Sequence, residues 1–466
     1  MLGLLITPSR INSLLQIVAI ASIWTLLEWS RLFFLSGISW NPAGLALTGS
    51  LYPLQMASLW GVFGLSFWVM LVNLLALRSW YRGKSILPWS TYAIAAALPY
   101  LYGFIHLHIH TQAMASQSAN TFGAVLVQTA FPAEHGNGVS ERKQLITHVL
   151  EQWKEILQAT KKQQGQQFDL LVLPEYTVPC GTYSCLLPYS LVRTAFLDIL
   201  GPKSVQDLPP LTSPFAHEWT TPNGKVHLVN NAFIAQGLAN HFNAGVVIGL
   251  EDAEDIHSGL REHYSAALYF RPCKDYDPNT FIVDRYEKRV LVPLGEYIPF
   301  AFCKAMAADY GIHSSFTCGK EAKVFKGNGN LPFGVSICYE ETFGDLMREN
   351  KLQGAELLVN LTSDAWYPNS RLPQQHFTHA RLRTVENGIP LIRSSNIGVT
   401  GAVDSLGRIV ALLGEDIERP EWLFDSIKVD VPRYTYSTLY SRFGDSVIIG
   451  FCFMASFFIF GFRPRK

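Results

Sequence analysis

Two long stretches of the sequence contain no charged residue. They run from Ala57 to Leu77 and from Ser85 to Ile105, and each is 21 residues long. A helix of about 20 apolar residues crosses the ~30 Å hydrocarbon core of a bilayer, so each stretch predicts a transmembrane helix. Pro88 and Pro99 interrupt the second stretch, but membrane helices tolerate proline. The chain is therefore expected to be a membrane protein.

Two further apolar stretches lie near the ends of the chain. Ser446–Phe462 contains 17 residues without a charge, at the short end of the spanning range. The stretch from Ile11 to about Leu35 carries Glu28 and Arg31 at i,i+3 spacing on one helix face. These two residues are expected either to neutralise each other or to line a pocket for an acyl chain or headgroup. The sequence thus predicts four spans; a signal peptide is the alternative for the first, but it lacks a small-residue cleavage site at the usual distance.

The distribution of cations predicts the orientation of the spans. Basic residues lie between the second and third spans and after the fourth, whereas residues 36–56 carry no charge. Because cytoplasmic segments are rich in Lys and Arg, the third span is expected to deliver the following chain to the outer side. We therefore predict a membrane domain of about three helices over 1–109, an extracytoplasmic domain over 110–443, and a C-terminal helix with a basic cytoplasmic tail over 444–466. The cations concerned are Arg78, Arg82, Lys84, Arg463, Arg465 and Lys466.

The composition excludes some functions for this chain. It has 37 basic and 37 acidic residues, so no overall positive field would attract a nucleic acid. Its seven cysteines form no paired CxxC pattern, which argues against a structural zinc site. In an oxidising compartment, Cys180 with Cys185 and Cys303 with Cys318 are the disulfide candidates nearest in sequence.

The predicted outer domain alternates helices and strands. A helix with one apolar face is expected over 140–158, and a late hairpin is expected to turn at Ser405–Gly407. Short apolar or β-branched runs bounded by turn residues predict strands at 124–128, 169–173, 245–250, 334–337, 356–360 and 390–393. The expected class is α/β, with sheets covered by helices.

Three residues in this domain have types that together support acyl transfer. Glu175 directly follows a predicted strand, Cys338 ends another, and Lys288 precedes the apolar segment LVP. Taken singly, they are interpreted as a helix-start carboxylate, a buried structural cysteine and a surface lysine. Together they supply a thiol nucleophile, a carboxylate to accept its proton and an ammonium to stabilise an oxyanion.

The segments around these residues resemble a known family. LVLPEYT, YEKRVLVPLGEY, GVSICYEETF and NLTSDAWY, in this order, resemble the carbon-nitrogen hydrolase (nitrilase) superfamily. With the flanking spans, the chain is most similar to the apolipoprotein N-acyltransferases, which are bacterial membrane enzymes. The resemblance implies an αββα sandwich flanked by transmembrane helices. It also implies a multi-pass protein of the bacterial inner membrane, with its catalytic domain on the periplasmic side.

The resemblance assigns roles to individual residues. It implies that Cys338 is the nucleophile, Glu175 the general base and Lys288 the oxyanion stabiliser. It implies a ping-pong reaction in which Cys338 takes an acyl chain from a phospholipid such as phosphatidylethanolamine and passes it to the N-terminal amine of an S-diacylglyceryl-cysteine apolipoprotein. No metal or other cofactor is implied. The residues expected to bind substrate or to support the site are Glu296, Tyr339, Glu340 and Trp366.

Two other functions are alternatives. A membrane-tethered amidase or nitrilase would have the same triad and use water as the acceptor. A non-catalytic scaffold would keep only the fold and would have no reason to hold Glu175, Lys288 and Cys338 together. The apolar loops 179–191 and 299–311 are expected to face lipid or to cover the site, with ordinary core packing as the alternative.

The chain departs from the family's usual pattern in several places. Fewer N-terminal spans than usual are expected in this sequence, with Met1 lying inside a longer product as the alternative. It has Leu173 where a Trp is usual, and residues 131–138 lack the usual Trp. Ser363 and Pro368 replace the usual residues around the DAW segment. These departures bear on the choice of donor and acceptor, since all three catalytic positions are kept.

Overall fold

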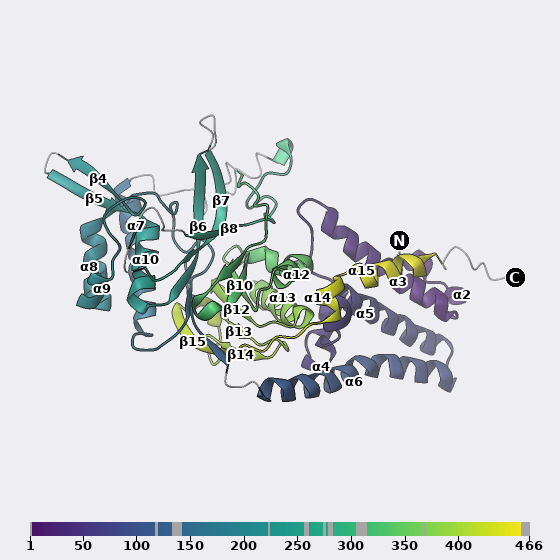
Figure 1. The fold of residues 1–466 in the computed structure, drawn as a ribbon. Coiled ribbons are helices and arrows are strands. Elements are labelled where there is room, and N and C mark those ends of the chain that lie inside the picture. The colour runs from purple at the N-terminus through teal and green to yellow at the C-terminus, as the bar shows by residue number, and fades with distance from the viewer. Residues whose placement is uncertain are drawn as a thin grey trace.

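The protein has a helical part at one end and an α/β body at the other (Figure 1). This architecture comes from a computed structural model that describes residues 2–116, 120–132, 142–221, 224–255, 261–273, 276–277, 283–303, 315–367 and 369–457. The last residues of the predicted fourth span and the basic tail lie outside these ranges, as does most of the loop 299–311.

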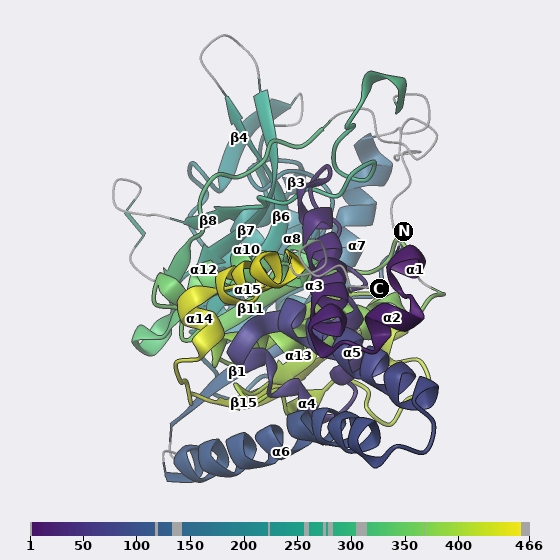
Figure 2. The same ribbon diagram turned by 90° about the vertical axis from the view of Figure 1, so that its right-hand side faces the viewer.

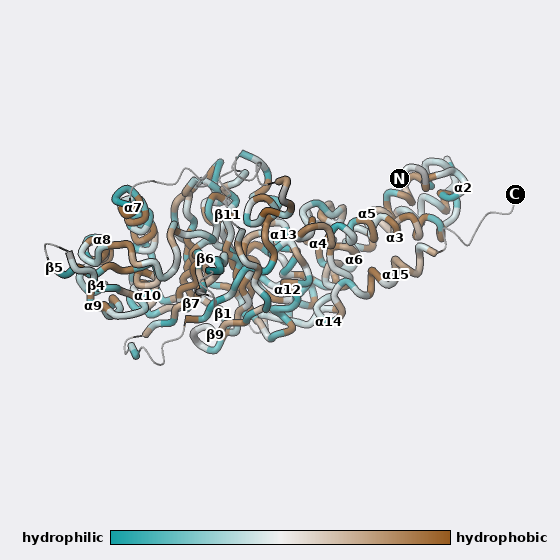
Figure 3. Tube along the Cα trace, turned by 90° about the horizontal axis from the view of Figure 1, so that it is seen from above, coloured by the Kyte–Doolittle hydropathy of each residue, from teal (hydrophilic) through white to brown (hydrophobic). Residues whose placement is uncertain are grey.

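The helical part contains two helices that are long and apolar enough to cross a membrane. They are α5 (Ala57–Tyr81) and α6 (Ile86–Ser116), and they match the two uncharged stretches of the sequence. The first and last predicted spans form the shorter apolar helices α3 (Leu14–Ser30) and α15 (Ser446–Ser456). Both contact α5 and each other, so segments from opposite ends of the chain lie side by side (Figure 2). Figure 3 shows that α3 and α5 consist largely of hydrophobic residues.

The helical part also contains short helices before and between the longer ones. Gly103 allows α6 to pack directly on the main chain of Tyr52, since a Cβ at this glycine would lie 1.8 Å from the Tyr52 oxygen. The short helices are α1 (Leu2–Leu5), α2 (Pro8–Ile11), η1 (Arg31–Phe33), η2 (Ala43–Leu47) and α4 (Leu51–Leu54).

The body contains two six-stranded mixed sheets. The first has the order β15-β1-β2-β6-β7-β8, in which β1, β2 and β6 run parallel. Its strands are β1 (Thr121–Gln128), β2 (Leu170–Val172), β6 (Gly245–Asp255), β7 (Arg261–Phe270), β8 (Asp284–Glu287) and β15 (Asp425–Pro432).

The second sheet has the order β14-β13-β12-β11-β10-β9, in which β10, β11 and β12 run parallel. The late hairpin is confirmed, with its turn at Ser405–Gly407 between β13 and β14. The strands are β9 (Val324–Lys326), β10 (Pro332–Ile337), β11 (Leu357–Ser363), β12 (Leu391–Asn396), β13 (Gly401–Val403) and β14 (Ile409–Leu412).

The two sheets pack face to face, and helices cover their outer faces. Apolar side chains from both sheets form one buried cluster between them. A second cluster joins the first sheet to α7 (Arg142–Lys161), α8 (Tyr189–Leu200) and α10 (Asn231–Phe242). A third joins the second sheet to α12 (Gly344–Leu352) and α13 (Leu372–Asn387). This is the αββα sandwich that the family resemblance implied, and it confirms the α/β class predicted from the sequence.

Smaller elements complete the body. The strands β3 (Leu187–Pro188), β4 (Ala216–Thr221) and β5 (Gly224–Val229) form a third, small sheet, which projects from the end of the molecule far from α3 and α5 (Figure 1). The remaining short helices are α9 (Pro202–Gln206), η3 (Ala301–Cys303), η4 (Asn328–Asn330), η5 (Cys338–Thr342), η6 (Pro420–Trp422) and α14 (Leu439–Phe443).

The expected neutralisation of Glu28 by Arg31 is wrong. The Glu28 carboxylate accepts hydrogen bonds from the Trp24 indole and the Ala43 amide, both at 2.8 Å. The Arg31 guanidinium donates instead to the carbonyl oxygens of Glu28 and Asn41, both at 3.4 Å. Each side chain is instead bonded by one partner from α3, the Trp24 indole or the Glu28 carbonyl, and by one backbone group of the loop that follows, at Ala43 or Asn41.

The two near-sequence disulfides do not form in the structure. Cys185, Cys303 and Cys318 all have free thiols. Each predicted pair contains at least one of them.

Candidate active site

Glu175 lies just beyond the carboxyl end of β2, against the neighbouring strand β6. The two segments approach closely because position 249 in β6 is a glycine, and a Cβ there would lie 2.6 Å from the Glu175 Cα. Backbone hydrogen bonds from Gly249 to Pro174 and from Thr177 to Gly249 hold this contact. The carboxyl ends of parallel strands therefore place Glu175 at the sheet edge where α/β proteins bind ligands.

Lys288 follows β8 and is almost completely buried, with 1% of its surface exposed. Its Nζ donates to Glu175 Oε1 at 2.9 Å and to Glu296 Oε1 at 2.7 Å. Glu296 is in turn held by the Val292 amide at 2.9 Å. The structure thus brings three of the predicted residues into one buried ionic group.

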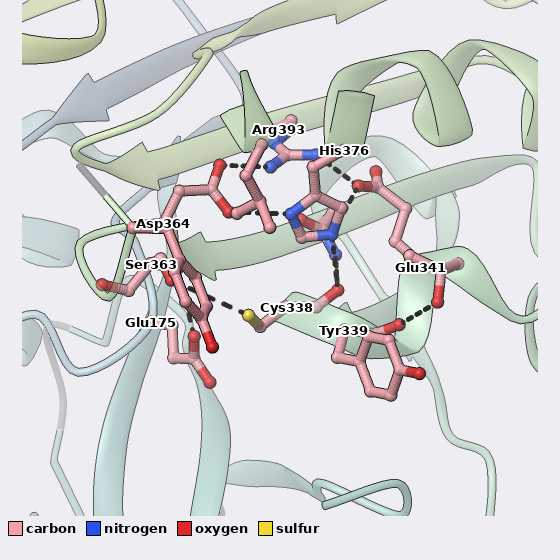
Figure 4. A network of polar contacts seen from close by, with 12 residues as sticks. Glu175, Cys338, Tyr339, Glu341, Ser363, Asp364, His376 and Arg393 are labelled. Carbon is pink, nitrogen blue, oxygen red and sulfur yellow. Dashed lines mark hydrogen bonds and ion pairs between the residues drawn. The ribbon is translucent and has the colours of Figure 1, made fainter. Parts of the chain in front are cut away.

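Cys338 sits at the sharp turn from β10 into the short helix η5. Its φ of +51° lies in the left-handed region, which residues with a side chain rarely adopt. Its Sγ points toward Ser363 at the end of β11, 3.9 Å from the carbonyl oxygen (Figure 4). The Ser363 amide donates to Glu175 Oε2 at 3.1 Å, so one residue contacts both the predicted nucleophile and the predicted base.

The ionisation of these groups suits proton transfer near neutral pH. Burial raises the pKa of Glu175 to about 7; Lys288 opposes this shift and Glu296 adds to it. Burial alone would lower the pKa of Lys288, but the carboxylates of Glu175 and Glu296 raise it well above the ordinary value. Burial also raises the pKa of the Cys338 thiol. A neutral thiol, a permanent ammonium and a carboxylate that gains or loses a proton near pH 7 are therefore adjacent.

Glu340 holds the segment of Lys288 against the turn of Cys338. Its buried carboxylate accepts from the Tyr286 hydroxyl at 2.9 Å and from the Arg289 and Val290 amides at 2.6 and 3.1 Å. It also accepts from the Ile337 amide at 2.8 Å. One carboxylate thus ties the residues around Lys288 to the residue before Cys338.

Tyr339 points away from the thiol, toward the loop that follows α3. Its hydroxyl donates to the Gly37 carbonyl at 2.8 Å, and its ring stacks on Trp40 with centroids 5.4 Å apart. The Ser39 and Thr342 hydroxyls are 2.5 Å apart and form a second hydrogen bond across this contact. The loop of the helical part is therefore packed directly against the turn that carries Cys338.

A buried polar network lies next to this turn, on the side of the Cys338 carbonyl (Figure 4). His376 of α13 contacts Asp364 Oδ1 at 2.8 Å and the Cys338 carbonyl oxygen at 3.2 Å. Arg393 of β12 donates to Asp364 Oδ2 at 3.1 Å and to the Glu341 carboxylate. All four charged or ionisable side chains are buried.

A cavity of about 350 Å³ opens beside the site. Trp366, which is 44% exposed, and Ser363 line it together with residues next to Glu175. The first predicted covering loop contributes Pro179 and Cys180 to the wall, whereas its Leu187 is packed in the core. In the described part of the second loop, Phe300 and Phe302 are exposed and stack on each other.

The sequence indicated the residues of the ionic group and the thiol, but not the buried polar network beside them. Arg393 carried a signal, since a charged residue in the predicted strand 390–393, directly after two apolar residues, requires a partner when the strand is buried. His376 and Glu341 carried none, because their contacts depend on how α13 packs. Among the described residues, no cluster of three or more His, Cys, Asp or Glu side chains is arranged to hold a metal ion.

Replacing Gly249 with Ala should displace Glu175. The added methyl group would lie 2.6 Å from the Glu175 Cα and from the Pro174 oxygen, so the strand end must move. Since a shift of about 1 Å in a catalytic group costs about 10²-fold in rate, we expect Gly249→Ala to lower turnover by about that factor. Gly49→Ala, where nothing lies within 4 Å of the added methyl, is the control. Equal activity of the two variants would contradict the placement of Glu175.

Comparisons with known proteins give consistent matches. Residues 137–429 match the family model "Carbon-nitrogen hydrolase", and residues 1–75 match "Apolipoprotein N-acyltransferase N-terminal domain". A protein from Chlamydia pneumoniae named apolipoprotein N-acyltransferase is 33% identical over 93% of this chain and 74% of its own length. One of the same name from Chlamydia caviae is 32% identical over 92% of this chain and 73% of its own length. Among solved structures, a carbon-nitrogen hydrolase from Helicobacter pylori is 18% identical, covers 67% of this chain and 90% of its own, and has a TM-score of 0.40.

Proposed function

The chain belongs to the carbon-nitrogen hydrolase family and, within it, to the apolipoprotein N-acyltransferases, and from this membership we propose how it works. It N-acylates lipoproteins: a fatty acyl chain passes to the N-terminal amine of an S-diacylglyceryl cysteine. The acyl donor is a phospholipid such as phosphatidylethanolamine, and the intermediate is a thioester on Cys338. The observation that carries this proposal is the position of Lys288, whose ammonium is buried between the carboxylates of Glu175 and Glu296. Glu175 also contacts Ser363, and so does the Cys338 thiol.

In the first half-reaction, Glu175 takes the thiol proton as Cys338 Sγ attacks an ester carbonyl of the phospholipid. The Lys288 ammonium stabilises the oxyanion that forms on that carbonyl. When the carbon–oxygen bond breaks, the departing lysophospholipid oxygen takes the proton from Glu175. The products are a Cys338 thioester and a lysophospholipid, and Glu175 is again ionised.

In the second half-reaction, the α-amine of the lipoprotein attacks the thioester carbonyl. Glu175 takes a proton from the amine and returns it to the Cys338 sulfur as the carbon–sulfur bond breaks. The product is an amide, and the free thiol is restored. Glu296 keeps Lys288 in place, Glu340 fixes the segment of Lys288, Tyr339 anchors the turn, and Trp366 contacts substrate in the cavity.

We assign the chain to the bacterial inner membrane as a multi-pass protein with its catalytic domain on the periplasmic side. Helices α5 and α6 are long enough to span, and we assign α3 and α15 as further spans because they are apolar and pack beside α5. The membrane domain then comprises residues 1–109, the catalytic domain 110–443, and the last span and tail 444–466. Both substrates keep their acyl chains in the bilayer, which explains why the catalytic domain is tethered there.

The experiment that tests this function is conversion of a synthetic diacylglyceryl-cysteine lipopeptide by the purified protein in phosphatidylethanolamine vesicles. We expect a product heavier by one fatty acyl chain, with the new chain on the α-amine, and one lysophospholipid released per product. Release of lysophospholipid and free fatty acid without a modified lipopeptide would instead assign water as the acceptor.

The rate of thioester formation should depend on pH through Glu175. Its carboxyl has a pKa of about 7 and acts only when ionised. The single-turnover rate is therefore expected to rise about tenfold per pH unit below pH 7 and to level off above it. The measurement is rapid-quench mass spectrometry of the acylated protein between pH 5.5 and 8.5. A rate that falls as the pH rises through 7 would contradict the assignment of Glu175 as base.

A further inference from the structure

His376 lies outside the ionic group of Glu175, Lys288 and Glu296 and contacts the main-chain carbonyl of Cys338 rather than its thiol (Figure 4). It has no exposed surface, so it cannot touch a lipid substrate. Its Nδ1 is 2.8 Å from Asp364 Oδ1, and its Nε2 is 3.2 Å from the Cys338 carbonyl oxygen. The imidazole therefore connects a buried carboxylate to the backbone of the predicted nucleophile.

The partners of the ring determine its protons. Asp364 Oδ2 accepts a hydrogen bond at 3.1 Å from the guanidinium of Arg393, which is a permanent cation, so Asp364 is ionised and can only accept a hydrogen bond from His376. The Cys338 carbonyl oxygen also can only accept. Both ring nitrogens must then donate, whereas a neutral imidazole has a single N–H.

The surrounding charges support a positive ring. The Arg393 guanidinium binds both Asp364 and Glu341, and Glu341 Oε2 lies 3.5 Å from His376 Nε2. Two carboxylates are thus matched by one guanidinium and one imidazolium, which leaves the buried group neutral overall. Charges without solvent contact are tolerated when they are paired in this way.

We propose that His376 is an imidazolium that holds the carbonyl of Cys338 and so acts as a positioning residue for the thiol. Cys338 has a φ of +51°, a conformation that persists only when the surrounding structure holds it. A charge-assisted hydrogen bond from His376 Nε2 to the Cys338 carbonyl supplies that restraint, while the thiol faces Ser363 and Glu175. The consequence for acyl transfer rests on the proposed function, but the positioning of the thiol does not.

The test compares the reactivity of two cysteines in the same full-length protein. Iodoacetamide alkylation of Cys338 is measured by peptide mass spectrometry relative to that of the exposed Cys318. We expect His376→Leu to lower the Cys338 to Cys318 rate ratio at least tenfold, and His376→Gln, which keeps one N–H donor, to lower it less. His241→Gln, at a histidine of α10 that contacts Asp207 Oδ2 at 3.0 Å and lies outside this network, is the matched control and should stay within twofold. A His376→Leu ratio within twofold of the wild type would overturn the proposal.

A second variant tests the charge and covers the case in which His376→Leu fails to fold. Asp364→Asn keeps an oxygen acceptor for Nδ1 but removes the negative charge that pairs with the proposed imidazolium. The other charged or titratable groups near the ring are Glu341, Arg393, Arg383 and His379. The measured quantity is the alkylation rate of Cys338 in Asp364→Asn divided by that in the wild type, since the titration of Glu175 cancels in this quotient. The quotient should rise at least threefold from pH 8.5 to pH 6. A quotient independent of pH would refute the imidazolium. Neither assay uses a lipid, so failure of lipid acylation in the wild type would count against the function alone.

Discussion

Cys338→Ala and Cys338→Ser are expected to reduce lipopeptide acylation by about 10⁴-fold or more, to the background rate. The alanine variant has no nucleophile, and the serine hydroxyl is a far weaker acid than a thiol in the same buried position. Both replacements are small and leave the contacts of Tyr339 and Glu340 in place. The thermal unfolding midpoint and detergent-extracted yield should therefore match those of the wild type.

The matched control for this prediction is Cys185→Ala, which removes another free thiol of the same domain outside the proposed site. It should retain full activity. An active Cys338→Ala protein would show that the acyl chain does not pass through this sulfur.

Lys288→Met should have the second largest effect, and it should act on both rate and stability. Loss of the ammonium removes the group that stabilises the oxyanion, and we expect a fall of about 10³-fold in thioester formation. It also leaves the carboxylates of Glu175 and Glu296 buried together without their partner. Breaking a buried pair of this kind typically costs about 3–5 kcal/mol of folding free energy, so a clear drop in the unfolding midpoint is expected.

The double variant Lys288→Met with Glu296→Gln separates the two effects. It removes one of the two stranded carboxylates, so most of the lost stability should return while activity stays low. Thermal unfolding and single-turnover acylation, measured on the same preparations, check this. Recovery of activity in the double variant would show that Lys288 serves only to balance charge.

The sequence predicted the long apolar helices and the central strands well. Helices α5 and α6 are marked by uncharged stretches that only a membrane or a large core accommodates. The parallel strands β1, β2, β10 and β11 are buried on both faces, so they appear as continuous apolar runs.

Helix α13 was not predicted, for a physical reason. Its sequence LPQQHFTHARLRTVEN has no apolar face, yet 11 of its 16 residues are buried. Arg383 donates to Glu386, and His376 bonds Asp364, so polar side chains replace the apolar face. A pattern of hydrophobic spacing cannot detect burial that depends on polar partners from other elements.

The candidate site, too, was predictable only in part. Glu175 and Cys338 were predictable because each ends a strand within a family motif, and the structure places both beside Ser363. The contact of Glu175 with Gly249 and the direction of Tyr339 toward Gly37 were not predictable. Both depend on segments that are far apart in the sequence and meet only in the folded chain.

The most direct test of the central claim is the intact mass of the purified, detergent-solubilised protein after incubation with phosphatidylethanolamine. We predict a mass increase of one fatty acyl chain that hydroxylamine removes, that Cys338→Ala lacks, and that a diacylated lipopeptide discharges to an amide. A protein that acylates the lipopeptide while showing no adduct on Cys338 would contradict the thioester mechanism.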